Sequence, residues 1–386
     1  MNCPHFGQCG GCAYPHQDFW QQLADKFQKF RQEITPVLGP GQSEILLAPR
    51  ACVNQLYYRN KMEFAFGQSP DGQPLLGLRR KRSFREVVNL DDCLLFGPGL
   101  ATTLNLWRNF IQESNRPVYN LYNHQGFWRY LVMRKSFSTN QWLNILITTT
   151  PENNFATVQQ KLEQMFKKLK SNFPPTSGLV WLLNDGLSDT ATGKIFSVFG
   201  QEYLTEEIAG KTFLIHSLTF FQINPPTLNL LIQTINDWVK NISYRQRALD
   251  LYCGVGLLSL FLADWFGSVS GVELNPQSIQ SAIENARVNN QKNVGFFNAD
   301  VYEYLKKGQN NFDLIVVDPP RAGLGKKVIE QLLKTNSPTI IYVSCNPRTL
   351  ADDLKILTPK YKIKKIQPID FFPYTPHLES VTLLTL

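Results

Sequence analysis

The sequence predicts an α/β protein whose C-terminal part is a doubly wound parallel sheet and whose central part is an α+β domain. After Pro225-Pro226, helical stretches alternate with short apolar runs and glycine turns, which is the βαβ rhythm of a parallel sheet. Upstream, from about residue 50 to 205, short strand-like runs are separated by turns, a pattern typical of antiparallel strands. Residues 1–17 are rich in Cys, Gly and His and have no helical period.

The 386 residues suggest about two to three domains, since one domain rarely grows this large. We expect an N-terminal segment with a helix at 1–49, a central domain at 50–210 and a C-terminal domain at 211–386. No apolar run approaches the ~18 residues of a membrane span, and the first residues do not resemble a signal peptide. These features predict a cytoplasmic protein whose seven cysteines are thiols or ligands rather than disulfides.

The individual elements follow from periodicity. Phe19, Leu23, Phe27 and Phe30 recur at helical spacing, so a helix is expected within 18–35. In the central region we expect strands at Lys61–Phe66, Leu75–Leu78 and Trp142–Ile147 and a helix at 153–170. In the C-terminal region we expect, in chain order, the elements Thr227–Val239, Ala248–Tyr252, Leu257–Trp265, Val269–Val272, Gln277–Asn289, Phe312–Val317, Lys326–Leu333 and Thr339–Val343.

A glycine turn follows the first of these C-terminal strands. The run from Asp250 to Gly256 leads a strand into a turn and then a helix, which leaves amide groups open to a ligand. Ser259 replaces the third glycine of the dinucleotide fingerprint, so no pyrophosphate cradle is expected. Glu273 ends the next strand, where an acid accepts ribose hydroxyls, and Asp300 ends the following one, where it can receive an adenine amine. A nucleoside without a pyrophosphate fits this set, and S-adenosylmethionine is our prediction, although a lone glycine turn is most often only a turn.

A cysteine stands at the end of the last predicted parallel strand. The apolar run Thr339–Val343 delivers Cys345 to the carboxyl edge of the sheet, where ligands bind in open α/β folds. Asp318, in Asp-Pro-Pro-Arg, points to the same edge. Cys345 is therefore a candidate nucleophile, whereas an isolated cysteine would more often be a buried, inert thiol.

These motifs occur in an order that resembles the RNA uracil-C5 methyltransferases. The matching segments are Phe220–Asn224, Asp250–Gly256, Asp318–Arg321, Ser344–Pro347 and His377–Glu379. The resemblance implies a Rossmann-like methyltransferase domain with Cys345 as the nucleophile that attacks carbon 6 of uracil and Glu379 as the proton acceptor. It also implies that S-adenosylmethionine is bound by Gln222, Tyr252, Gly254, Glu273, Asp300 and Asp318. Many relatives have Asn where Leu257 stands, so Leu257 is left out of the site.

Four N-terminal cysteines form a candidate metal site. Cys3, Cys9 and Cys12 have the spacing C-x5-C-x2-C, and Cys93 follows far along the chain. Four thiolates suit either zinc or an iron–sulfur cluster. The resemblance implies a 4Fe–4S cluster, with Cys52 as the other candidate for the fourth ligand.

The net charge of +8 and pI near 9.0 favour a polyanionic partner such as RNA, although many basic enzymes bind none. Candidate RNA contacts are Arg59, Lys61, Arg129 and Arg134, which lie in runs that mix cations with aromatics. The resemblance favours a uridine of 23S rRNA as substrate and a monomeric enzyme, with the tRNA T-loop as the alternative substrate. Two other classes stay open at this point: a catalytically silent RNA-binding protein, and an amino-group methyltransferase that uses the Asp-Pro-Pro segment.

Overall fold

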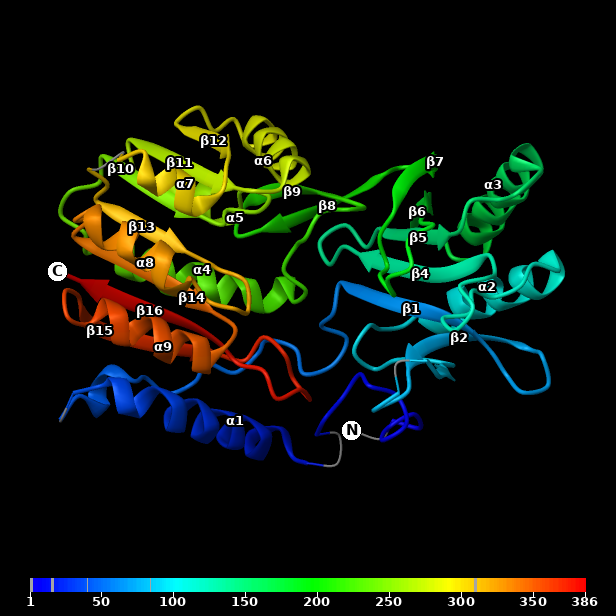
Figure 1. Cartoon of the computed structure of the whole chain (residues 1–386), viewed down its shortest axis with the longest axis horizontal. Coiled ribbons are helices and arrows are strands. Elements are labelled where there is room, and N and C mark those ends of the chain that lie inside the picture. The colour runs from blue at the N-terminus through cyan, green and yellow to red at the C-terminus, as the bar shows by residue number, and fades with distance from the viewer. Residues whose placement is uncertain (1–2, 15–16, 40, 84, 309–310) are drawn as a thin grey trace. The chain divides into compact units, whose positions relative to one another are not determined.

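The chain folds into two compact units in the computed structural model, which describes residues 3–14, 17–39, 41–83, 85–308 and 311–386 (Figure 1). The first unit contains the described part of Met1–His16 together with Asn54–Glu207 and Leu214–Leu218. The second contains Gln17–Val53, Ile208–Phe213 and the described part of Thr219–Leu386. This division differs from three consecutive regions, because the helix after the N-terminal cysteines packs with the C-terminal unit.

That helix, α1 (Phe19–Ile34), is amphipathic. Asp18 caps it by accepting hydrogen bonds from the amides of Trp20 and Gln21. Its apolar residues Phe19, Leu23, Phe30 and Ile34 are buried in the core of the second unit, where α1 packs against α9 (Pro347–Leu357). Burial of this apolar stripe explains why α1 belongs with the second unit. Two short 3₁₀ turns follow, η1 (Thr35–Val37) and η2 (Ser43–Ile45).

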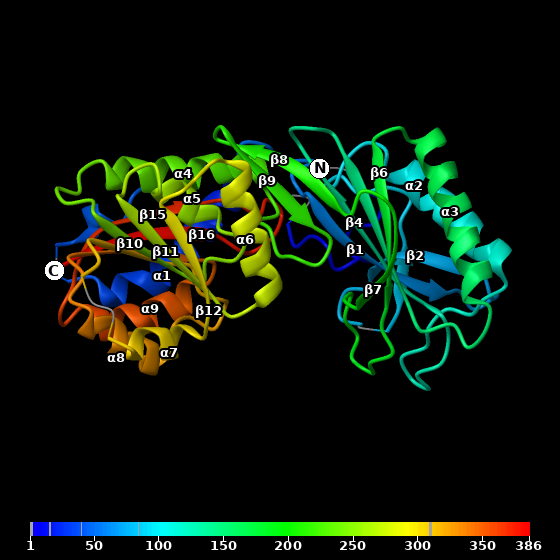
Figure 2. The ribbon, with the colours of Figure 1, turned by 90° about the horizontal axis from the view of Figure 1, so that it is seen from above.

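The second unit is built on a seven-stranded sheet of order β12-β11-β10-β13-β14-β16-β15. Its strands are β10 (Arg247–Leu251), β11 (Ser268–Glu273), β12 (Val294–Asn298), β13 (Leu314–Val317), β14 (Thr339–Ser344), β15 (Lys362–Ile369) and β16 (Glu379–Thr385). Helices cover both faces, α4, α5 and α6 on one and α1, α7, α8 and α9 on the other (Figure 2). The helices not yet defined are α4 (Pro225–Val239), α5 (Leu257–Leu262), α6 (Pro276–Val288), α7 (Val301–Lys306) and α8 (Gly325–Lys334).

The expected doubly wound sheet is confirmed, with one difference. Strands β10 to β14 run parallel, but β16 pairs antiparallel with β14 and with β15. No strand was expected after Val343, so this hairpin is a difference from the predicted sheet. The reversal matters because it brings the start of β16 to the edge where β14 ends.

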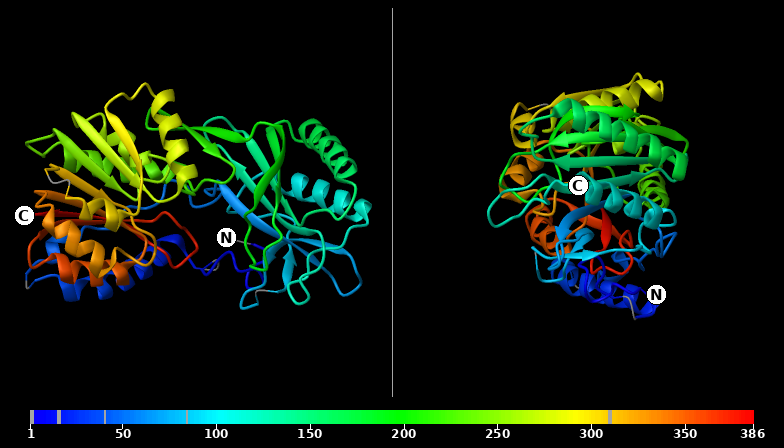
Figure 3. Two further views of the ribbon diagram at one scale, coloured as in Figure 1. Left: turned by 45° about the horizontal axis from the view of Figure 1, so that its top comes forward. Right: turned by 90° about the vertical axis from the view of Figure 1, so that its right-hand side faces the viewer.

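The first unit contains a second seven-stranded sheet, of order β3-β2-β1-β4-β5-β6-β7, with the helices α2 and α3 packed on it (Figure 3). Its elements are β1 (Lys61–Gln68), β2 (Pro74–Arg79), β3 (Val87–Asn89), α2 (Leu100–Ser114), β4 (Trp128–Lys135), β5 (Trp142–Thr148), α3 (Phe155–Asn172), β6 (Thr176–Leu183) and β7 (Lys194–Gly200). The pairing is antiparallel except between β5 and β6, which α3 connects. A two-stranded sheet of β8 (Tyr203–Ile208) and β9 (Lys211–His216) follows.

Helix α2 was not expected from the sequence. It begins after Gly99, which has φ +95° and whose missing Cβ leaves room for the ring of Phe173. Its buried face carries Leu100, Leu104 and Trp107. Among the described residues, no helix is both long enough and apolar enough to cross a membrane.

Candidate active site

Cys345 and Glu379 meet because two neighbouring strands run in opposite directions. Strand β14 ends at Ser344, and β16 starts at Glu379. Ser344 pairs with Ser380 across the ladder, and the Ser380 hydroxyl donates a hydrogen bond of 3.3 Å to the Ser344 carbonyl. Cys345, one residue after this pair, and Glu379, one residue before it, therefore stand at the same edge of the sheet.

The loop after β13 is tied to this edge. Asp318 directly follows β13, which pairs in parallel with β14. Three residues later, the Arg321 carbonyl accepts hydrogen bonds from the Asn346 amide at 3.0 Å and from the Thr349 hydroxyl at 3.2 Å. The loop that carries Asp318 and the turn that carries Cys345 are thus held together by the first turn of α9.

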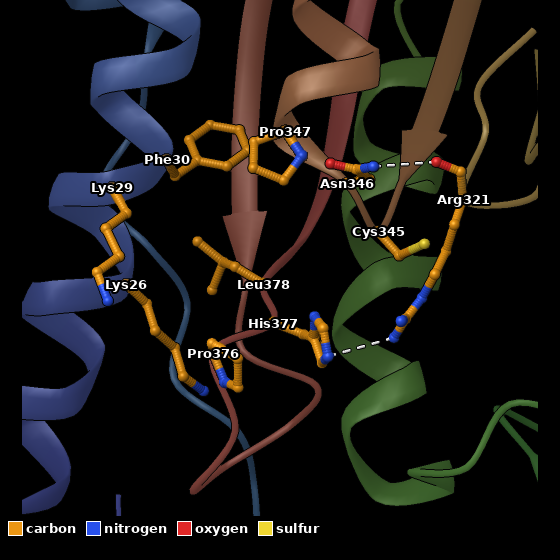
Figure 4. A pocket seen from close by; sticks show the side chains of 10 residues that line it. All are labelled: Lys26, Lys29, Phe30, Arg321, Cys345, Asn346, Pro347, Pro376, His377 and Leu378. Carbon is orange, nitrogen blue, oxygen red and sulfur yellow. Dashed lines mark hydrogen bonds between the residues drawn. The ribbon is translucent and has the colours of Figure 1, made fainter. Parts of the chain in front are cut away.

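A cavity of about 200 Å³ opens beside the thiol (Figure 4). It is lined by Lys26, Lys29, Phe30, Arg321, Cys345, Asn346, Pro347, Pro376, His377 and Leu378. Figure 4 shows the Cys345 sulfur facing the Arg321 side chain, whose Nη2 lies 3.3 Å from Nε2 of His377. The wall opposite Arg321 comes from α1.

The ionisable groups at this edge shift one another's pKa values. Burial raises the pKa of the Cys345 thiol to about 11, the charges of Glu379 and Asp318 add to that effect, and Arg321 opposes it. Burial also raises the pKa of Glu379 well above its ordinary value, Asp318 adds to this, and Arg321 again opposes it. The pKa of Asp318 is raised by burial and by Asp250. The guanidinium of Arg321 thus opposes the rise in pKa of both the Cys345 thiol and the Glu379 carboxyl.

The backbone of the glycine turn after β10 is open at Gly254. Gly254 has φ +53°, and a Cβ built there would meet no atom within 4 Å, so the backbone is open to a ligand. Its amide donates to Glu273 Oε2 at 3.2 Å, while Glu273 Oε1 accepts from the Asn275 amide at 2.8 Å. Glu273 is thereby held beside open space, as an acid that receives ribose hydroxyls must be.

Two more predicted cofactor residues lie near Glu273. Burial raises the pKa of Tyr252 to about 12, and the charges of Asp300 and Glu273 contribute to the rise, so the three side chains are neighbours. Asp300 also caps α7 by accepting a hydrogen bond of 3.1 Å from the Glu303 amide. Gln222 lies on another segment, which is joined to the loop before β16 by a hydrogen bond of 2.9 Å from the Asn224 side chain to the Phe371 carbonyl.

Comparisons with known proteins agree with this arrangement. The model of the family "tRNA (Uracil-5-)-methyltransferase" matches residues 187–386. An uncharacterized RNA methyltransferase from Caldanaerobacter subterraneus subsp. tengcongensis is 36% identical, over 99% of this chain and 84% of that protein. A tRNA (uracil(54)-C(5))-methyltransferase from Pyrococcus horikoshii is 32% identical, over 99% of this chain and 85% of that protein. The chain belongs to the RNA uracil-C5 methyltransferase family.

A solved structure supports the same conclusion. The Pyrococcus abyssi tRNA (uracil-54, C5)-methyltransferase, in complex with S-adenosyl-L-homocysteine, superposes with a TM-score of 0.79 at 27% identity. The match covers 100% of this chain and 87% of that one. The protein is therefore an S-adenosylmethionine-dependent RNA uracil-C5 methyltransferase, and the expected family, fold and enzyme class are confirmed.

The N-terminal cysteines of this methyltransferase lie close to one another in the first unit. The segment that carries them is hydrogen-bonded to the end of β2: the Gly10 amide donates to the Arg79 carbonyl, and the Lys81 amide donates to the Gln8 carbonyl. The Asp91 amide also donates to His5 Nε2 at 3.3 Å. The described cysteines form no disulfide.

Burial raises the pKa values of these thiols. It raises that of Cys12 to about 12, with further rises from Cys93, Cys9 and Cys3, while Arg59 lowers it. Burial also raises the pKa values of Cys9 and Cys93. Within the described ranges, however, no group of three or more His, Cys, Asp or Glu side chains has the arrangement to hold a metal ion.

The candidate RNA contacts of the methyltransferase have different surroundings. Lys61 pairs with Glu63 at 2.7 Å and is partly exposed. Arg59 lies near the cysteines and the Met62 sulfur rather than on an open face. Arg134 is only 4% exposed, and burial lowers its pKa to about 10.

Arg129 is not supported as an RNA contact. It is 2% exposed, and its guanidinium donates to the carbonyls of Asn184, Gly186 and Ser188. Its role in the structure is to hold the 184–188 loop against β4. All eight residues of β4 are buried, so its aromatics and cations do not form an open face for RNA.

Sequence reasoning missed three contributors to the site. Arg321 was quoted only as the last residue of the Asp-Pro-Pro-Arg segment, but it is the cation that lowers the pKa of the Cys345 thiol. His377 was quoted only as part of the H-x-E pattern, and its contact with Arg321 was not foreseen. Lys29 comes from α1, some 300 residues away in sequence, and no local signal connects it to Cys345.

Proposed function

We propose that Cys345 is the nucleophile and Glu379 the proton acceptor of the methylation of uridine at carbon 5. The observation that carries the proposal is the antiparallel pairing of β14 and β16, which sets a thiol and a carboxyl side by side at the ligand-binding edge of the sheet. A third group, Asp318, follows the neighbouring strand β13. An inert buried cysteine would need none of these neighbours.

The chemistry requires both groups. The Cys345 thiolate adds to carbon 6 of uracil, and the displaced electrons form an enolate whose carbon 5 is nucleophilic. S-adenosylmethionine supplies the electrophilic methyl carbon that carbon 5 takes. Glu379 then removes the proton from carbon 5, and the electrons of that bond restore the ring double bond as the bond from carbon 6 to sulfur breaks.

The protonation states have to change before the first step. In the enzyme without ligands, burial favours the neutral thiol of Cys345 and the neutral carboxyl of Glu379. Arg321 is the group that opposes both effects, so we assign it the role of favouring the thiolate. A positive charge bound beside Asp318, such as a sulfonium, acts in the same direction.

We propose that the nucleoside part of S-adenosylmethionine is bound by Gly254, Glu273 and Asp300, with Tyr252 beside them. Gln222 and Asp318 are proposed to lie toward the methyl carbon that is transferred. The proposal rests on the open space at Gly254 and on the fixed carboxylate of Glu273.

Replacement of the nucleophile tests the assignment. Cys345→Ala should abolish methyl transfer while the affinity for S-adenosylmethionine, measured by calorimetry, stays within about twofold, because the thiol lies outside the nucleoside site. Cys52→Ala is the matched control, since Cys52 is a buried cysteine of the same unit that does not line the cavity beside Cys345. Full methylation by Cys345→Ala would refute the mechanism.

The substrate has two candidates. The sequence favours a uridine of 23S rRNA, whereas two archaeal relatives are named for uridine 54 of tRNA, which favours the tRNA T-loop. Mapping 5-methyluridine in rRNA and tRNA from a strain that lacks the gene discriminates between them: loss from one RNA identifies the substrate, and loss from neither refutes both. A cytoplasmic monomer stays our expectation for the enzyme in the cell.

We also propose that Cys3, Cys9, Cys12 and Cys93 hold a 4Fe–4S cluster that supports the first unit. The charges of Cys93, Cys9 and Cys3 act on the Cys12 thiol, so the four side chains lie near one another, which supports the proposal. Four thiolates also suit a zinc ion, which is the alternative to the cluster. Anaerobic protein with bound iron and sulfide that Cys93→Ser loses would support a cluster; stoichiometric zinc without iron would refute it.

A further inference from the structure

The cavity beside Cys345 has a basic lining. Four of its ten lining residues carry side-chain nitrogens that bind anions when protonated, namely Lys26, Lys29, Arg321 and His377, and none of the ten is Asp or Glu. Lys29 and Arg321 are both exposed. The carboxyls of Glu379 and Asp318, which serve the chemistry, do not belong to the lining.

The size of the cavity limits what it can hold. About 200 Å³ is less than the ~300–1,000 Å³ of sites that enclose a drug-sized ligand, so the cavity does not accommodate a whole S-adenosylmethionine. The glycine turn is also absent from its lining. A small anionic group fits both its volume and its charge.

Two of the four basic side chains have structural contacts that limit their role. Lys26 Nζ lies 2.8 Å from both Asp370 Oδ1 and the Phe372 carbonyl and has no exposed side-chain area. His377 Nε2 faces the Arg321 guanidinium. Lys29 and Arg321 are the exposed cations of the lining, and they come from its two sides.

One carboxylate competes with a ligand for Lys29. Asp25 lies one turn earlier on α1, and its pKa is lowered by hydrogen bonds from Gln17 and Gln21 and then by the charge of Lys29. Because Asp25 is exposed to water, its attraction for Lys29 is screened and weak. It does not line the cavity.

We propose that this cavity binds a backbone phosphate of the substrate RNA next to the target uridine, with Lys29 of α1 and Arg321 as its cations. The inference rests on the proposed function, because a uracil attached to Cys345 brings its own phosphodiester to the same edge of the sheet. Helix α1 then has a positioning role: it fixes the strand while the base is held at the thiol. Phosphate contacts position a nucleic acid without reading its sequence, which suits the positioning role proposed for Lys29.

The salt dependence of RNA binding tests this contact. In full-length Cys345→Ala protein, where no covalent adduct forms, binding of a labelled oligouridylate of about ten nucleotides is measured over a range of KCl concentrations. Lys29→Ala should weaken binding about three- to tenfold at low salt and make the slope of log K against log salt shallower by about 0.7. Lys327→Ala, which removes an exposed lysine of α8 outside the cavity, should leave the slope unchanged. Asp25→Asn should tighten binding slightly.

The outcomes separate the inference from the proposed function. An unchanged slope in Lys29→Ala refutes the phosphate site even if the wild-type enzyme methylates RNA. A shallower slope in Lys29→Ala supports the phosphate site. If the wild-type enzyme then transfers no methyl group to RNA, the phosphate site stands and the proposed function is refuted. S-adenosylmethionine affinity should be the same in Lys29→Ala and Lys327→Ala, which excludes general unfolding as the cause.

Discussion

At the residue scale, the reactivity of Cys345 is set by an imbalance of charge. The Arg321 guanidinium favours the charged forms of the Cys345 thiol and of Glu379, whereas burial acts against the charged forms of both and of Asp318. The consequence is that burial favours the protonated thiol of Cys345 in the enzyme without ligands. A thiol in such a site is protected from oxidation and alkylation until ligands change the field around it.

Alkylation measures this property directly. Because burial and the two carboxyls raise the pKa of Cys345 to about 11, its thiolate fraction in the free enzyme should rise roughly tenfold per pH unit between about pH 7 and 9. Iodoacetamide labelling of the Cys345 peptide, followed by mass spectrometry, should rise in the same proportion. Arg321→Gln should slow labelling at every pH, since it removes the charge that lowers the pKa, whereas Arg348→Gln should not. A labelling rate independent of pH would contradict the account.

At the element scale, the turn after β10 depends on two glycines in different ways. Gly254 faces open space, but a Cβ at Gly256, which has φ +82°, would lie 2.9 Å from the Phe296 ring and 3.1 Å from Ala282 Cβ. Gly256 therefore permits the left-handed turn, and it also lets β12 and α6 pack closely against that turn. The position of Gly254 relative to the cofactor follows from that packing.

Gly256→Ala should accordingly displace the turn. We expect a loss of about 1–3 kcal/mol of unfolding free energy beyond any cost of the left-handed backbone alone, and at least a tenfold loss of affinity for S-adenosylmethionine. Gly308→Ala is the control for the backbone cost, since Gly308 has φ +74° with no atom within 4 Å of the added Cβ. Equal effects of the two substitutions, by urea denaturation and calorimetry, would show that the clash has no role.

At the scale of the whole molecule, α1 connects the N-terminal part of the sequence to the catalytic loop. Lys26 of α1 and Asp370, which precedes β16, form an ion pair with no exposed side-chain area. The pair places Lys29, one turn later, beside the cavity. Removal of one partner from a buried pair costs about 3–5 kcal/mol, because the other charge is left without compensation.

Lys26→Met should therefore destabilise the protein, and the loss should depend on pH. The pKa of Asp370 is already raised by burial and is lowered by Lys26, so it rises further in the variant. A carboxyl with a raised pKa in the folded state binds its proton more tightly there than in the unfolded state. The loss of unfolding free energy in Lys26→Met is therefore largest above the folded-state pKa of Asp370, and it shrinks as the pH falls through that pKa. Urea denaturation at about pH 8 and pH 5 should show this difference; a deficit that grows toward low pH would contradict it. Lys29→Ala, an exposed lysine of the same helix, should leave stability unchanged.

The sequence predicted much of the fold, and it predicted the site residues whose placement at strand ends the proposed mechanism uses, because these signals are local. Apolar runs and glycine turns marked β10, β11, β13 and β14, and the motifs around Cys345 and Glu379 lie at strand ends. Contacts between distant segments had no such signal. The placement of α1 on α9, the pairing of β16 with β14 and the role of Lys29 depend on tertiary packing. Arg129 shows the opposite error, since a cation among aromatics in sequence is a buried structural residue in the fold.

The central claim is that Cys345 forms a bond to carbon 6 of uracil and that Glu379 ends the reaction by removing the proton from carbon 5. Glu379→Gln keeps the shape of the side chain but cannot accept that proton. After incubation with S-adenosylmethionine and substrate RNA, this variant should carry a methylated nucleotide on the Cys345 peptide, visible as a slower band on a denaturing gel and assigned by mass spectrometry. Cys345→Ala with Glu379→Gln should form no such band. The account would be contradicted if Glu379→Gln formed 5-methyluridine in RNA at the wild-type rate and released that RNA without a covalent adduct.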